Sequence, residues 1–157
     1  MKKTFLFIAL FVAIASQPLF AQESSKNQSG QLLSIYYDIK DALVSGNAAT
    51  ASAKAGDFVK AINSMDTKIV GEASREALLK DVTVISNSKD LKEQRVIFAP
   101  FSDNMIALAK TVKLSTDPVY QQYCPMKKAS WLSSQQTIKN PYYGSAMLTC
   151  GSVKATF

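Results

Sequence analysis

The sequence predicts an all-α protein: an up-down four-helix bundle with an irregular C-terminal tail, rich in Cys, Met and Tyr, packed on it. Two observations lead to this fold class. From residue 31 to residue 114, apolar residues recur at the spacing of a helix face. After Leu114 that spacing fades, and the rest of the chain holds both cysteines, the only tryptophan and four of the six tyrosines.

The first two predicted helices each have one apolar face. The face of the first comprises Leu32, Tyr36, Ile39 and Leu43. Gly46 and Asn47 are typical of a helix end and stop it. The face of the second comprises Ala51, Ala55, Phe58 and Ile62. Its many alanines favour a helix and a close approach to a neighbour. A break is expected over 64–68.

The third and fourth helices continue the pattern. The face of the third comprises Val70, Ala73, Ala77, Leu78, Val82 and Ile85. Asn87, Ser88 and Asp90 then supply an N-cap and a negative first turn. The face of the fourth comprises Ile97, Phe101, Met105, Leu108 and Val112. Pro100 must kink or break this helix. Because the apolar phase continues across Pro100, we expect one kinked helix rather than two that meet at Ala99.

The tail over 115–157 is predicted to be irregular, with a short helix over 119–123. Asp117-Pro118 and Asn140-Pro141 are typical turn starters. A loop that holds Tyr, Trp, Met and Cys is a usual place for function.

The N-terminal residues 1–21 are predicted to be a secretory signal peptide. Lys2 and Lys3 precede an apolar run over 5–15, and a more polar stretch ends in small residues at Ala21. The apolar run is too short to span a bilayer. Residues 22–30 are predicted to be a disordered mature N-terminus, and residues 31–157 a single helical domain. The mature protein is therefore expected in the periplasm or outside the cell, without a stable membrane anchor.

The composition excludes several classes of function. The chain has no histidine, which removes Ser-His-Asp and Cys-His nucleophiles and imidazole metal sites. The sequence has 18 basic residues, two of them in the predicted signal segment, and 12 acidic residues. The basic residues are scattered rather than clustered, so nucleic acid is not an expected partner. The protein is not expected to be an enzyme.

Four sulfur-bearing residues lie in two short motifs of the tail: Cys124, Met126, Met147 and Cys150. Thiolate and thioether are soft ligands that select soft cations, above all Cu(I). The same residues fit a second interpretation. Two cysteines in an exported domain commonly form a disulfide, and the methionines then fill the core. Residue types and spacing do not choose between the two.

The tail also offers candidate surface or pocket residues. Trp131 is interpreted as a core anchor rather than a binding platform. Tyr142 and Tyr143, after Pro141, are able to line a pocket, although half-buried packing is the simpler interpretation. The complete set of candidates is Tyr123, Trp131, Asn140, Tyr142 and Tyr143.

The pieces CPM, WLS, NPYYG and MLTCG occur in this order in the tail, and YYDIKDALVSGNAATASAKA and RVIFAPFSDNMIAL precede them. Over roughly Gln31 to Val153 this chain resembles the domain of unknown function 3347 family, common in exported proteins of the Bacteroidetes. The resemblance implies a link to periplasmic heavy-metal efflux adaptors of the CusB type. Cys124 to Met126 match the CPM of their Y-x-CPM-H-P metal-binding motif. Tyr123 stands directly before Cys124 rather than two positions before it, and Lys127 and Lys128 stand in place of the His-Pro.

Residue chemistry and resemblance together predict a periplasmic Cu(I)-type binding protein that sequesters the ion or passes it to an efflux partner. Its ligands are then the four sulfur residues named above. The alternative is a non-catalytic structural or interaction domain stapled by a Cys124–Cys150 disulfide.

Overall fold

A computed structural model describes residues 19–157, with side chains from residue 28 onward. The elements in chain order are α1 (Leu19–Ser45), α2 (Ala48–Ser64), α3 (Glu72–Asn87), α4 (Leu91–Thr111), β1 (Tyr120–Cys124), β2 (Ala129–Ser133), the 3-10 helix η1 (Gly144–Met147) and β3 (Ser152–Thr156). The secretory segment predicted for residues 1–21 lies outside the described residues, except for its last three, which begin α1. None of the helices within the described range is long and apolar enough to cross a membrane.

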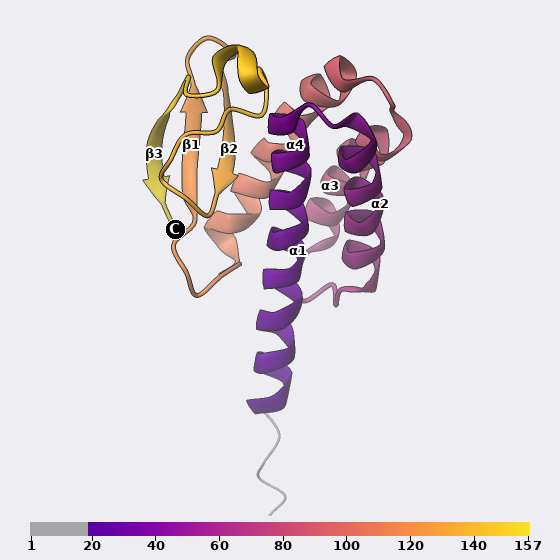
Figure 1. The fold of residues 1–157 in the computed structure, drawn as a ribbon. Coiled ribbons are helices and arrows are strands. Elements are labelled where there is room, and N and C mark those ends of the chain that lie inside the picture. Colours follow the sequence, from indigo (N-terminus) through magenta and orange to yellow (C-terminus); the bar gives the residue numbers. More distant parts are fainter. Residues whose placement is uncertain (1–18) are drawn as a thin grey trace, which may run out of the picture.

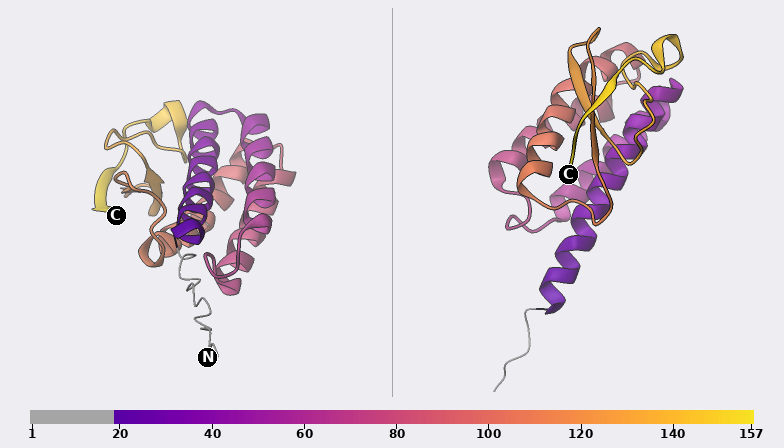
Figure 2. Two further views of the ribbon diagram at one scale, coloured as in Figure 1. Left: turned by 90° about the horizontal axis from the view of Figure 1, so that it is seen from below. Right: turned by 90° about the vertical axis from the view of Figure 1, so that its left-hand side faces the viewer.

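The four helices stand side by side, each packed on the next along the chain (Figure 1). The strands form a separate layer on one side of the bundle, which Figure 2 shows from two further directions. This layer contacts α4 through β2, while η1 contacts α1. The predicted all-α fold class is therefore wrong, and the protein is mixed α/β.

The tail that the sequence predicts to be irregular folds into a three-stranded antiparallel sheet in the order β2-β1-β3. The short helix predicted over 119–123 is instead most of strand β1. The alternation of polar and apolar residues that identifies a strand is not visible in β1, because a polar residue, Gln122, takes a fully buried position. The Gln122 side-chain amide donates to the backbone carbonyls of Gln135, Gln136 and Thr137, which offsets its desolvation.

The four predicted helix faces are present in the bundle. Every residue of the first two faces is fully buried. In α3 the buried face starts later than predicted, at Arg75, because Val70 lies before the helix and Ala73 is exposed. α4 runs unbroken through Pro100, so the alternative of two helices is wrong. Pro100 lies on the solvent side, where water can satisfy the carbonyl that loses its helical partner.

Residues 22–30, predicted to be disordered, are helical as the first part of α1. Two contacts at the end of this segment tie it to the loop after α4. The Ser29 hydroxyl donates to the Lys113 carbonyl at 3.4 Å, and Gly30 faces the Leu114 carbonyl. A helix that has been nucleated by such packing extends at little cost, even through a polar sequence.

Tyr36 joins the helices to the sheet. Its ring is fully buried against Phe98 and Phe101 of α4. Its hydroxyl lies 2.7 Å from the Ser102 hydroxyl and accepts a hydrogen bond from the Leu132 N–H of β2 at 3.1 Å. One side chain of α1 thus holds both α4 and the strand layer.

Replacing Tyr36 by phenylalanine is expected to lower the free energy of unfolding by about 1–3 kcal/mol, because it leaves a buried N–H and a buried hydroxyl without their partner. Tyr37→Phe is the matched control, since the buried Tyr37 hydroxyl has no hydrogen-bond partner to lose. Urea unfolding of both variants checks this. Equal losses in the two variants would contradict the role given to the Tyr36 hydroxyl.

Candidate functional site: two thiols at one end of the sheet

Cys124 and Cys150, 26 positions apart in sequence, meet at one end of the sheet, with their sulfur atoms 3.1 Å apart. Cys124 is the last residue of β1, and Cys150 lies two residues before β3 begins. Because β1 and β3 are antiparallel neighbours, with Tyr123 opposite Ser152, the chain brings both cysteines to the same end. Both are free thiols. Cys124 is fully buried and Cys150 is half-buried.

The turn after β1 supplies hydrogen bonds to the sulfur atoms. Residues 125–128 connect β1 to β2, and the turn closes with a 2.8 Å bond from the Lys128 N–H to the Cys124 carbonyl. Lys128 adopts a left-handed conformation, with φ of 55°. The backbone N–H groups of Met126 and Lys127 in this turn donate to the Cys124 sulfur, and that of Met126 also donates to the Cys150 sulfur. A cluster of backbone N–H groups of this kind favours an anion.

Asn140 holds the opposite side of the site. It is fully buried, and its amide donates to the Cys150 carbonyl at 2.8 Å and to the Cys124 sulfur. Its side-chain oxygen accepts from the Tyr142 N–H, and its backbone N–H donates to the Leu148 carbonyl, both at 2.8 Å. Asn140 therefore fixes the loop before Cys150 as well as the thiol pair.

The two thiols differ in acidity. Burial opposes ionisation of Cys124, but hydrogen bonds from Cys150, from the Lys127 and Met126 N–H groups and from Asn140 lower the pKa of Cys124 below its ordinary value. The hydrogen bond to Cys124, with burial and the nearby negative charge, raises the pKa of Cys150. The pair thus favours a Cys124 thiolate that accepts a hydrogen bond from the protonated Cys150 thiol. Thiolates are the nucleophilic and metal-binding form of cysteine.

The two methionines of the sulfur motifs are not packed as core filler. Met126, in the turn after Cys124, is 65% exposed, and Met147, at the end of η1, is half-buried. Both lie in segments that adjoin a cysteine. The described residues hold no group of three or more His, Cys, Asp or Glu side chains able to bind a metal ion. At this end of the sheet the structure brings two soft donors into contact, the thiols of Cys124 and Cys150.

The aromatic candidates are mainly structural. Trp131 is fully buried and meets Tyr142 edge-on, with ring centroids 5.9 Å apart. The Tyr142 hydroxyl donates to the Ser130 carbonyl at 2.5 Å. Tyr123 and Tyr143 are half-buried, and the Lys154 ammonium lies over the Tyr123 ring at 5.8 Å. Among these candidates only Asn140 contacts the thiols.

Two glycines and Arg95 position the loop that carries Asn140, and sequence reasoning gave neither glycine a role in the site. Gly144 and Gly151 have positive φ, and neither has room for a side chain. A Cβ on Gly144 would clash with Arg95 Nη2, and one on Gly151 would meet the Trp131 ring at 2.9 Å. Arg95 Nη2 donates to the Leu43 carbonyl at 2.7 Å, at the end of α1. The sequence did offer a signal for the two glycines, because Gly144 ends the piece NPYYG and Gly151 ends the piece MLTCG.

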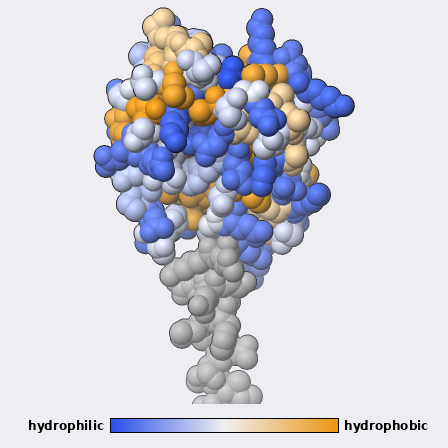
Figure 3. Space-filling model, in the orientation of Figure 1, coloured by the Kyte–Doolittle hydropathy of each residue, from blue (hydrophilic) through white to orange (hydrophobic). Residues whose placement is uncertain are grey.

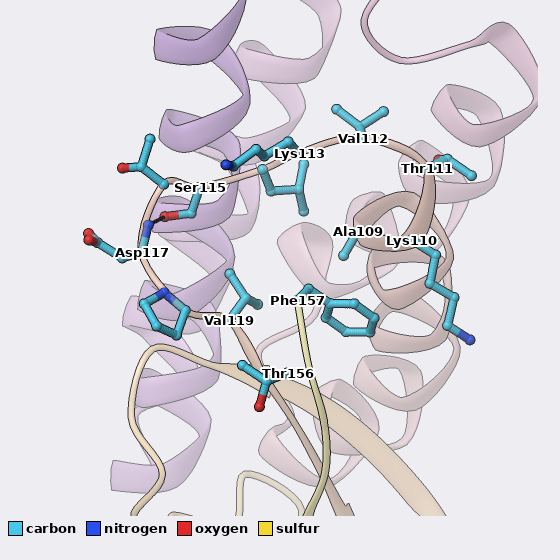
Figure 4. A pocket seen from close by; sticks show the side chains of 13 residues that line it. Ala109, Lys110, Thr111, Val112, Lys113, Ser115, Asp117, Val119, Thr156 and Phe157 are labelled. Carbon is cyan, nitrogen blue, oxygen red and sulfur yellow. Dashed lines mark hydrogen bonds between the residues drawn. The ribbon is translucent and has the colours of Figure 1, made fainter.

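A cavity of about 430 Å³ lies between the loop after α4 and the C-terminal residues of the chain (Figure 4). It is lined by residues 109–119 with Thr156 and Phe157, and the Phe157 ring forms part of its apolar wall. None of the residues that the sequence singles out for a site lines it.

A comparison with protein families gives one match, to the family described as "Protein of unknown function (DUF3347)", over residues 32–117. The matched residues run from α1 to the loop after α4, so the sheet and both sulfur motifs lie beyond them. No curated protein and no solved structure matches this chain. The match spans more than half of the sequence, and the chain therefore belongs to the DUF3347 family of proteins of unknown function.

Proposed function

We propose that this protein is an exported, non-catalytic binding protein for a soft cation of the Cu(I) type. Cys124 and Cys150 are its principal ligands, and Met126 and Met147 are additional thioether ligands. The observation that carries the proposal is the 3.1 Å separation of two thiols from distant parts of the chain. Soft thiolate and thioether donors, with no imidazole in the chain, select Cu(I) over harder cations.

The electrostatics of the site support this proposal. A metal binds the thiolate, so binding must displace protons from both cysteines. The backbone N–H groups of the 125–128 turn already favour the Cys124 thiolate. Metal–sulfur bonds of about 2.3 Å place two ligand sulfurs roughly 4 Å apart, so the thiols must separate by about 1 Å on binding. Cys150 is half-buried whereas Cys124 is fully buried, so in this proposal the Cys150 side chain makes this movement.

The exposure of Met126 favours a metal site over a purely structural one. Thioether side chains usually fill gaps in a core. Here Met126 is largely exposed beside the thiols, and Leu148 is also exposed in the segment before Cys150. Figure 3 shows hydrophobic residues at the surface over this upper part of the sheet side. A soft cation can be reached there from solvent or from a partner.

The proposed compartment and partner follow from the predicted signal segment and the family. A signal peptide sends the mature domain to the periplasm or outside the cell. The resemblance of Cys124 to Met126 to the CPM motif of heavy-metal efflux adaptors of the CusB type suggests the partner. In this proposal the domain holds the ion or transfers it to such an adaptor.

Titration of the reduced protein with Cu(I) under anaerobic conditions, against a chromogenic chelator, tests the proposal. The wild type is expected to hold one equivalent tightly, and a Cys124→Ser/Cys150→Ser double variant to lose it. Met126→Leu is expected to weaken binding about tenfold, a loss of roughly 1.4 kcal/mol. Met65→Leu is the matched control, since Met65 is a buried core residue between α2 and α3. Equal affinity of the wild type and the double variant would refute the proposal.

The second candidate is a structural or interaction domain stapled by a Cys124–Cys150 disulfide. The same separation of 3.1 Å favours it, because the sulfurs lie about 1 Å from bonding distance. In this case the cross-link fastens β1 to the segment that leads into β3. Complete oxidation of the purified protein, with no Cu(I) bound after reduction, would favour this candidate over the first.

A further inference from the structure

A cavity of about 420 Å³ opens beside the 125–128 turn, between that turn and the first turns of α4. The 125–128 turn lies at the upper end of the molecule in Figure 1, where α1 ends and β3 begins. The residues that line the cavity are Asp90, Leu91, Lys92, Arg95, Val96, Lys127 and Tyr142. Three of the seven are cations, and they come from two separate elements.

None of the three cations has an anionic partner. The four ion pairs found in the described part of the chain involve neither Lys92, Arg95 nor Lys127. The one carboxylate of the cavity, Asp90, accepts a hydrogen bond from the Lys92 N–H at 2.8 Å as the N-cap of α4. The tail that carries Lys127 is basic as a whole, with four lysines and a single acidic residue, Asp117, over residues 115–157.

The Arg95 side chain is held by one hydrogen bond and has further N–H groups that can donate to a ligand. Its Nη2 is fixed by the Leu43 carbonyl, while its Nε is buried and makes no hydrogen bond to any described residue. Burial lowers the pKa of the Arg95 guanidinium. A buried donor without a partner is costly, and a guanidinium that is already oriented matches the oxygens of a carboxylate or phosphate.

We propose that this cavity binds a small organic anion with two or more charged oxygens, held by Arg95, Lys92 and Lys127. Leu91, Val96 and Tyr142 supply apolar wall for the body of the ligand, which favours an organic anion over a simple inorganic one. The shared chemistry is that of a polycarboxylate or a phosphate ester. The anion site does not use the thiols. A failure of this proposal would therefore leave the metal-site proposal unaffected, and a failure of the metal site would leave the anion site unaffected.

The test is a titration of the reduced, metal-free protein with citrate and, separately, with the phosphate ester glycerol 3-phosphate, followed by ¹⁵N chemical shifts at low ionic strength. We expect saturable shifts at Lys92, Arg95 and Lys127. A Lys92→Glu/Lys127→Glu variant, which leaves Arg95 in place, should bind at least about tenfold more weakly, because two charge-assisted contacts become repulsive. Binding should weaken with added salt.

The control is Lys68→Glu/Lys80→Glu, which makes the same change in net charge on two exposed lysines far from the cavity lining. It should leave the affinity unchanged. Preference for citrate identifies a carboxylate ligand, and preference for glycerol 3-phosphate a phosphate-ester ligand; either result supports the site. Absence of saturable shifts with both probes would overturn the proposal, and so would equal weakening in the two double variants, which would show a general charge effect.

Discussion

Replacing Gly144 by alanine is expected to lower the free energy of unfolding by about 3 kcal/mol, and Tm by roughly 10 °C. Gly144 has a φ of +55°, which disfavours any residue with a Cβ. The added carbon would also lie 2.8 Å from the Val44 carbonyl and clash with Arg95 Nη2. To relieve the clash, Arg95 must give up its hydrogen bond to the Leu43 carbonyl. The loop from Asn140 to Cys150 then loses its packing against the helices.

Thermal unfolding of Gly144→Ala beside Gly56→Ala measures this effect. Gly56 lies within α2 with an ordinary helical φ, and its Cβ would meet only the Ser86 hydroxyl at 3.4 Å. That substitution is expected to change stability by at most about 1 kcal/mol, because better helix propensity offsets a mild contact. A Gly144→Ala protein as stable as the wild type would show that the loop packs against the helices differently from the arrangement described above.

Oxidation of the Cys124–Cys150 pair is expected to raise the free energy of unfolding by about 3.5 kcal/mol. The two residues are separated by 26 positions, and closing a loop of this length lowers the entropy of the unfolded chain by that amount in the chain-entropy model. The sulfurs already lie 3.1 Å apart, so the folded state needs little rearrangement. Oxidation should also abolish Cu(I) binding, because both thiol ligands are consumed.

Urea unfolding of the protein before and after mild oxidation, with thiol counting, checks this prediction. The Cys124→Ser/Cys150→Ser variant is the control and should not respond to the oxidant. Oxidation without a gain in stability would mean that the cross-link strains the sheet. A pair that resists oxidation but binds Cu(I) would favour the metal site as the working state of the thiols.

The helical half of the fold could be predicted from sequence because its signal is local. Leu32, Tyr36, Ile39 and Leu43 lie one turn apart, so their burial on one face follows from helix geometry alone. The N-cap of α4 was predicted in the same way, since Asp90 accepts from a backbone N–H only two residues away. The family match covers this same half of the chain.

The sheet could not be predicted because its stability comes from partners distant in sequence. β3 has mostly exposed residues and becomes a strand by pairing with β1, more than 25 residues earlier. β1 carries the buried Gln122, whose hydrogen bonds go to the 135–137 loop. The alternation that identifies a strand is lost when a polar side chain takes a core position.

The candidate site, like the fold, could be predicted from the sequence only in part. The sequence by itself determined which atoms are present: four sulfurs in two short motifs and no imidazole, which restricts any metal to a soft cation. Only the tertiary structure decided that Cys124 and Cys150 touch, that backbone N–H groups favour one thiolate, and that three unpaired cations share a neighbouring cavity. The physical reason is that residue types are a local property. Their separation is set by strand pairing and by the packing of the sheet on α4.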